Sequence, residues 1–173
     1  MAIVQAFDEA PGNPVDRTPP QDLAAEQSVL GAMLMSKDAI ADVVETVTGA
    51  DYYRPAHELI HRAIIDLYGR GEPADPVTVA DELGKRGDLG RVGGHVYLHD
   101  LLASVSVAAN AAYYADIVRE KAVLRRLVEA SIKIAQMGYQ ATGDVADIVD
   151  AAQQTIYEVS EGKTAEDYKP LSV

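Results

Sequence analysis

Residues 110–139 form the stretch that decides the fold, NAAYYADIVREKAVLRRLVEASIKIAQMGY. It contains no proline, and its single glycine, Gly138, stands next to its end. Such an uninterrupted run predicts one helix about 45 Å long, which is longer than a small domain requires. Its apolar residues form two neighbouring stripes that together cover roughly half of the helix. The first stripe holds Ile117, Leu124, Val128 and Ala135, and the second holds Val123, Leu127 and Ile134.

A second helix is predicted after the turn at Thr142–Gly143, with Asp144 as its N-cap. Its apolar residues recur in a near-heptad pattern, so residues 109–162 are predicted to form an antiparallel helical hairpin. We expect five residues to form the hairpin core: Ile117, Leu124, Ile148, Ala152 and Ile156. The long helix is too broadly apolar for one partner helix. Its second stripe therefore needs another partner, either the head or another subunit. We expect Leu127, Val128 and Ile134, together with Tyr97 of the head, to lie at a contact with another protein chain.

Residues 21–108 are predicted to form a small head of five shorter helices, which makes the whole fold all-α. The helices are expected from residue 21, over 38–47, from Pro55 to Leu67, from Asp75 to Gly84, and over 95–105. The last of these is expected to bury Val96 and Leu98. Residues 1–20 are punctuated by proline and predict a disordered tail, and residues 163–173 predict a linker.

The composition narrows the classes of function. Asp and Glu number 27 against 15 Lys and Arg, so the net charge is −12 and nonspecific binding of nucleic acid is disfavoured. We expect protein partners instead, with Arg125 and Arg126 on a polar flank that can meet acidic groups. The absence of cysteine excludes disulfides and thiol chemistry. No apolar run is long enough to span a bilayer and the N-terminus lacks a basic signal region, so we expect a cytoplasmic protein.

His57-Glu58-Leu59-Ile60-His61 matches H-E-x-x-H, the helical motif of zinc-dependent hydrolases. In such enzymes the two histidines bind zinc and the glutamate activates a water molecule. A catalytic zinc needs a third protein ligand, and no downstream pattern supplies one. A zinc hydrolase remains the alternative function, although we expect neither a metal site nor catalytic residues here.

Two other patterns are weaker. His95 and His99 form a second pair four residues apart, and two such pairs could in principle form a tetrahedral metal site, but we interpret them as partly exposed polar residues that flank the core. Gly162-Lys163-Thr164 matches the end of a phosphate-binding loop, but position 157 is tyrosine where that loop begins with glycine, and a helix precedes it where a strand is required.

An ordered series of short motifs resembles the N-terminal domain of the bacterial replicative DNA helicase, the DnaB family. The series covers residues 18 to about 160. It includes Pro19-Pro20, Ala25-Glu26-Gln27-Ser28-Val29-Leu30-Gly31, Asp51-Tyr52-Tyr53 with His57, Gly71-Glu72-Pro73, Gly93-Gly94, Tyr97-Leu98, Tyr113-Tyr114, Glu120-Lys121 and Leu124-Arg125-Arg126-Leu127.

The resemblance implies a helical head and hairpin that pair into dimers, assemble as a trimer of dimers into a hexamer, and receive the C-terminal domain of primase. ATP, magnesium and DNA unwinding belong to a motor domain that the resemblance places after the linker and that no motif here matches. The resemblance therefore implies a noncatalytic fragment of an ATP-dependent helicase, with no cofactor and little DNA binding of its own. A helical adaptor unrelated to replication is a third possibility.

Overall fold

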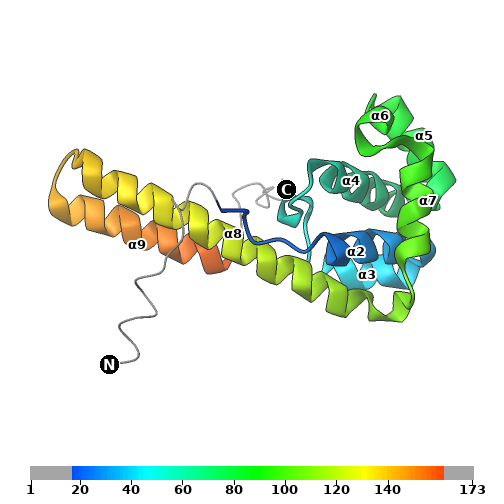
Figure 1. The fold of residues 1–173 in the computed structure, drawn as a ribbon, viewed down its shortest axis with the longest axis horizontal. Helices are drawn as coiled ribbons and strands as arrows, with labels where there is room; N and C mark the ends of the chain where they lie inside the picture. Colours follow the sequence, from blue (N-terminus) through cyan, green and yellow to red (C-terminus); the bar gives the residue numbers. More distant parts are fainter. Residues whose placement is uncertain (1–16, 162–173) are drawn as a thin grey trace, which may run out of the picture.

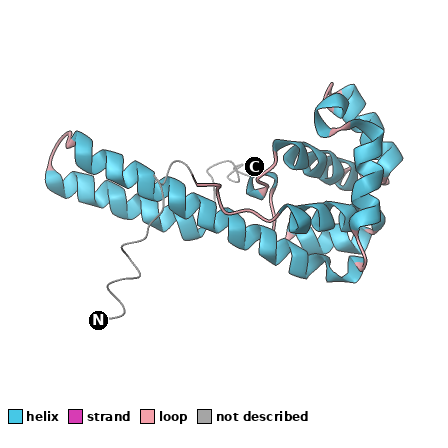
Figure 2. Ribbon diagram, in the orientation of Figure 1, coloured by secondary structure: helices cyan, strands magenta, loops and turns pink. Residues whose placement is uncertain are grey.

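The structure, a computed structural model, describes residues 17–161 and is helical, with no strand among these residues. The predicted tail and linker lie largely or wholly outside the described residues, as does Gly162-Lys163-Thr164. The helices form a compact head and a long hairpin, and the hairpin extends outward from the head (Figure 1). Short loops connect the helices (Figure 2). The all-α prediction is confirmed.

All seven predicted helices form, and three short helical segments join them. The head contains α2 (Leu23–Met35), α3 (Lys37–Val44), η2 (Gly49–Asp51), α4 (Pro55–Gly69), α5 (Pro76–Lys85), α6 (Leu89–Val92), α7 (Gly94–Ser104) and η3 (Ala108–Asn110). The hairpin consists of α8 (Ala111–Gln140) and α9 (Val145–Glu161).

Local chemistry explains where the helices begin. The Asp22 carboxylate accepts the backbone N–H of Ala25 at 2.9 Å and caps α2. Asp75 caps α5 in the same way by accepting the N–H groups of Val77 and Thr78, each at 2.9 Å. Pro55 and Pro76 occupy the first helical turn, where a missing N–H group costs no hydrogen bond.

The core of the head surrounds α2, which packs against α3, α4, α7 and α8. Val29, Leu30 and Met33 on α2 are fully buried there. On α7, Leu98 and Leu101 face this core, but Val96 is 71% exposed, so its predicted burial is wrong. Val96 lies in the first turn of α7, where its side chain stays in solvent, whereas Leu98 and Leu101 further along the helix are buried.

The face of α8 that packs on the head is built from small residues. Its buried positions are Ala111, Ala115, Val118 and Ala122, at the three- and four-residue spacing of one helix face. Because alanine lets two helix backbones approach closely, this stripe excludes water with little side-chain volume. The large residues of α8 lie on other faces.

The predicted hairpin core is wrong for three of its five residues in the single chain. Ile117 is 37%, Leu124 is 44% and Ile156 is 46% exposed, and Ile148 and Ala152 are half-buried. The buried positions along α8 and α9 beyond the head are Ala130 and Val159. Two packed helices cover only a narrow seam, so a broad apolar surface stays accessible on both.

No single helix of residues 17–161 is long and apolar enough to cross a membrane; α7 and the segment 108–140 meet the criterion only as a pair, across an 87° bend.

Candidate functional site

The head and the hairpin are joined through Asp51, the last residue of η2, whose side chain is fully buried. Its Oδ1 accepts hydrogen bonds from Arg119 Nη1 at 3.2 Å and from Arg126 Nη2. Its Oδ2 accepts the backbone N–H of Thr48 at 2.9 Å. Since both arginines belong to α8, a charge cluster around a buried carboxylate fixes the long helix to the head.

Arg125 adds a further connection at the same joint. Its Nη2 donates to the backbone oxygen of Asp51 at 2.5 Å, and its Nη1 donates to the backbone oxygen of Pro20 at 2.9 Å. The guanidinium carbon lies 5.6 Å from the centre of the Tyr53 ring, within cation–π range. Burial lowers the pKa of Arg125. The acidic group that Arg126 meets is thus a carboxylate of its own chain.

A second polar network crosses the core of the head and centres on Glu26, which is 1% exposed. Its carboxylate accepts the backbone N–H of Tyr53 at 2.9 Å and lies 2.8 Å from His57 Nδ1. Because both carboxylate oxygens act as acceptors here, His57 Nδ1 carries the hydrogen that it donates. His57 Nε2 lies 2.5 Å from the Tyr97 hydroxyl, and this hydroxyl accepts a hydrogen bond from Arg54 Nη1 at 3.3 Å.

This network links α2, α4 and α7 through polar groups. Tyr97 is only half-buried, and its ring lies nearly parallel to that of His57, with 5.9 Å between the ring centres. The phenol therefore has a structural role inside the head in addition to its predicted interface role. The sequence contained one indication of this network, because Glu26 falls on the same face of α2 as Leu23 and Leu30.

The four predicted interface residues do not form one patch. Leu127, Val128 and Ile134 lie on α8, whereas Tyr97 lies on α7, at the end of the molecule away from the hairpin turn (Figure 1). Leu127 and Val128 are exposed and Ile134 is half-buried. Their assignment to an interface stays a prediction.

Comparison with known protein families shows to which family this chain belongs. The family described as "DnaB-like helicase N terminal domain" matches residues 18–120, which include all of the head and the start of α8. The chain belongs to this family. Two curated relatives of this DnaB-like domain are Replicative DNA helicase DnaB of Mycobacterium leprae, 60% identical over 93% of this chain, and that of Leifsonia xyli, 59% identical over 91%. The chain spans 27% and 34% of their lengths.

Solved structures share the fold of this DnaB-like domain. The crystal structure of the N-terminal domain of DnaB helicase from Mycobacterium tuberculosis is 63% identical with a TM-score of 0.79, covering 82% of this chain and 99% of that one. A DnaB-like replicative helicase, described with its interactions with primase, has a TM-score of 0.66 at 22% identity and covers 87% of this chain and 33% of that one. The resemblance stated from the motifs is confirmed.

The H-E-x-x-H residues of this DnaB-like domain have other partners, which gives the zinc-hydrolase alternative no support. His57 is held by Glu26 and Tyr97, and His61 Nδ1 lies 2.8 Å from the Tyr52 hydroxyl. Glu58 forms an ion pair with Arg62 at 2.7 Å. Within the described residues, no three His, Cys, Asp or Glu side chains gather in a group that could hold a metal ion, and His95 and His99 are exposed.

The lowered pKa of the buried His61 side chain predicts that the protein loses stability in mild acid. Burial, followed by the charge of Arg62, lowers its pKa from 6.5 to about 4. Between these values the unfolded chain binds a proton at this position and the folded chain does not, so the free energy of unfolding falls as the pH falls. We expect a slope of up to about one proton from this residue between pH 6.5 and pH 4.

Urea unfolding at stepped pH measures this slope. His61→Gln is expected to reduce it by the contribution of one histidine, whereas His99→Gln, at an exposed position, leaves it unchanged. An unaltered slope in His61→Gln would contradict the assignment.

Proposed function

We propose that this chain is the noncatalytic collar domain of a replicative helicase, a domain that assembles with copies of itself and docks primase. The observation that carries the proposal is the row of large apolar side chains that the hairpin leaves exposed. Leu124, Leu127, Val128 and Ile132 on α8 are each 39% exposed or more, and Val149, Ile156 and Tyr157 on α9 are exposed as well. Contiguous apolar surface of this kind marks an interaction site on a soluble protein.

A second copy of the chain is the first proposed partner. Around a two-fold axis, the same surface of both chains meets itself, so one apolar row suffices for a self-complementary contact. Three such dimers, closed around a common axis, would form a hexameric collar. The charge cluster at Asp51 supports this arrangement, because it holds the hairpin in a defined orientation relative to the head.

The C-terminal domain of primase is the second proposed partner. A protein of the same fold is described with its interactions with primase, and the family membership of this chain makes the same partner the first to test. The net charge of −12 favours protein contacts over DNA. We assign DNA unwinding, ATP and magnesium to a motor domain of the whole protein, acting in the cytoplasm, and little direct DNA binding to this domain.

Val128→Asp tests the proposed interface. A carboxylate placed in the centre of an apolar contact loses its hydration without gaining a partner, so we expect association to weaken about tenfold or more while the helical circular dichroism is kept. Gln136→Asp, at an exposed and originally neutral position of the same helix, is the matched control for the added negative charge. Light scattering over a concentration series gives the mass of each variant, and a pull-down with purified primase C-terminal domain gives the second contact.

The two readouts separate the proposed roles. Loss of self-association alone assigns Val128 to the contact between copies, and loss of primase binding alone assigns it to the primase contact. Wild-type mass and wild-type primase binding in Val128→Asp, and equally in Ile134→Asp, would overturn the proposal for this face of α8.

A further inference from the structure

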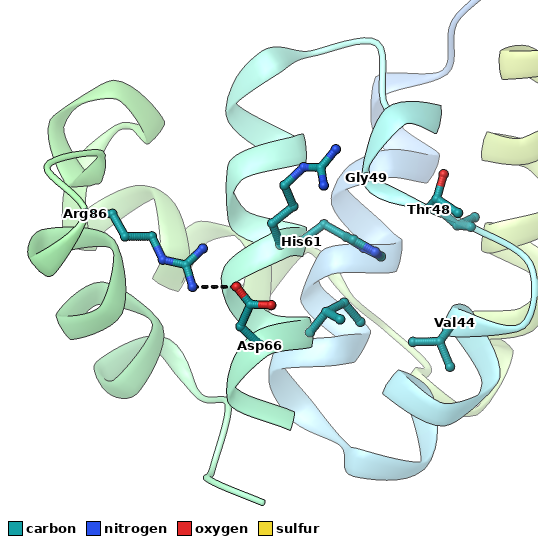
Figure 3. A pocket seen from close by; sticks show the side chains of 9 residues that line it. Val44, Thr48, Gly49, His61, Asp66 and Arg86 are labelled. Atoms are coloured by element: carbon teal, nitrogen blue, oxygen red, sulfur yellow. Dashed lines mark hydrogen bonds and ion pairs between the residues drawn. The ribbon is translucent and has the colours of Figure 1, made fainter. Parts of the chain in front are cut away.

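A pocket of about 320 Å³ opens on the head between the end of α3, η2 and α4. Figure 3 shows His61 reaching from α4 toward Thr48 and Gly49, with Val44 on the wall next to them. Of these side chains only Thr48 also contacts the joint, through its hydrogen bonds to Asp51, and none belongs to the apolar row of the hairpin. The pocket is therefore a feature of the head that the proposed collar role leaves unused.

His61 places a hydrogen-bond donor at the base of this pocket. The imidazole is 4% exposed, and its Nδ1 lies 2.8 Å from the hydroxyl of the buried Tyr52. Burial raises the pKa of Tyr52, so the phenol keeps its hydrogen, and His61 Nδ1 is the acceptor within reach of it. The remaining nitrogen, Nε2, consequently carries a hydrogen, and no described residue of 17–161 accepts it.

Arg62 adds a second donor beside the first. A Cβ atom at Gly49 would lie 3.1 Å from Arg62 Nε, so the guanidinium group rests on the bare backbone of η2 at the edge of the pocket. Its Nε and Nη2 donate to Glu58 at 3.1 and 2.7 Å. Its Nη1 has no partner among the described residues, which leaves two N–H groups available to a ligand.

The acidic side chain on the pocket wall does not oppose an incoming anion on its own. Asp66 accepts a hydrogen bond from Arg86 Nη2 at 2.6 Å, and Figure 3 shows its carboxylate turned toward that arginine. Arg86 also pairs with Glu82 at 2.8 Å. Both arginine charges at the pocket are thus ion-paired, Arg86 with Asp66 and Glu82 and Arg62 with Glu58, and the open donors are His61 Nε2 and Arg62 Nη1.

The remaining wall is apolar. Val44, Val47 and Ile65 line it, and Val44 is 42% exposed. An apolar group placed against these side chains would remove water from them, which favours binding roughly in proportion to the area covered. A ligand that satisfies the whole pocket therefore combines an apolar body with acceptor oxygens.

We propose that this pocket binds the C-terminal residue of a peptide chain, with its apolar side chain against Val44 and Ile65 and its carboxylate on His61 Nε2 and Arg62 Nη1. A carboxylate matches these two donors, because Arg62 Nη1 belongs to a guanidinium group, which is paired with Glu58 through its other nitrogens, and hydrogen bonds to charged groups are the stronger class. The volume fits one large aliphatic or aromatic residue. This proposal does not rest on the collar function, because the pocket lies entirely in the head.

N-acetyl-L-leucine and N-acetyl-L-leucinamide test the proposal as a pair of probes that differ only in the carboxylate. Each is titrated into the ¹⁵N-labelled 173-residue chain, and amide shifts in residues 44–49 and 61–66 report on the pocket. We expect saturable shifts confined to these segments, with the acid binding about tenfold more tightly than the amide.

Arg62→Gln removes the free donor at an exposed position, and Arg70→Gln is the matched control, since Arg70 is also an exposed, ion-paired arginine but lies outside the pocket. We expect Arg62→Gln to abolish the preference for the acid and Arg70→Gln to retain it. Equal binding of acid and amide, an unchanged preference in Arg62→Gln, or no saturable shift in these segments would each overturn the proposal.

Discussion

Asp51→Ala is expected to lower the free energy of unfolding by about 3–5 kcal/mol, because it removes a fully buried carboxylate and leaves two mostly buried arginine side chains without their partner. Arg119 and Arg126 both lose their carboxylate, and the backbone N–H of Thr48 loses its acceptor. One guanidinium nitrogen, Arg126 Nη1, is already buried without a partner. The three arginines of α8 would then be held at the head by little more than the backbone oxygens of Asp51 and Pro20.

Urea unfolding followed by circular dichroism measures this loss. Asp81→Ala is the matched control, because Asp81 forms an ion pair with Lys85 in which both side chains are at least 67% exposed, and exposed pairs of this kind contribute about 0–1 kcal/mol. A stability of Asp51→Ala within error of that of Asp81→Ala would show that the joint is held by packing of the alanine stripe and not by charge.

Gly31→Ala is the second large effect, expected to destabilise the head by about 3 kcal/mol through overpacking. A Cβ atom at this position would lie 2.2 Å from the backbone oxygen of Leu101 and 2.4 Å from a methyl group of Val105. A backbone oxygen cannot rotate away as a flexible side chain can, so α2 and α7 would have to separate at the centre of the core.

Gly84→Ala in α5 is the control, because this substitution is expected to raise the free energy of unfolding instead of lowering it. No atom lies within 4 Å of the Cβ position there, so the substitution gains the helix propensity of alanine, about 0.5–1 kcal/mol, without a clash. Thermal and urea unfolding of both variants give the comparison. If Gly31→Ala were as stable as Gly84→Ala, the contact between α2 and α7 would have to be looser than the structure shows.

Helix positions were predictable because each depends on residues close in the chain. Asp22 and Asp75 cap helices that begin one residue later, and Pro55 opens α4. The end of α3 was placed three residues too late, at Val47 instead of Val44. Val47 is buried, although it lies outside the helix, so its apolar side chain continued the helical pattern without continuing the helix.

The candidate sites were predictable only in part. H-E-x-x-H identified two histidines with distinctive partners. The motif gave no indication of Glu26 and Tyr97, which contact His57 from 31 and 40 residues away in the sequence. The cluster at Asp51 was not predicted at all. Its arginines follow 68 and 75 residues later, and no local spacing connects them with an acidic residue in a short turn.

The sequence by itself determined the seven helices, the hairpin, the apolar breadth of α8 and the relationship to the DnaB-like family. Only the tertiary structure decided which face of α8 meets the head. Periodicity identifies apolar faces on a helix but not the helix that each face will meet. It also leads one to expect that large side chains such as Leu124 form the buried contact. The head instead packs on Ala115, Val118 and Ala122, because close approach of two backbones favours small residues, and this choice leaves the large apolar residues of α8 exposed for other partners.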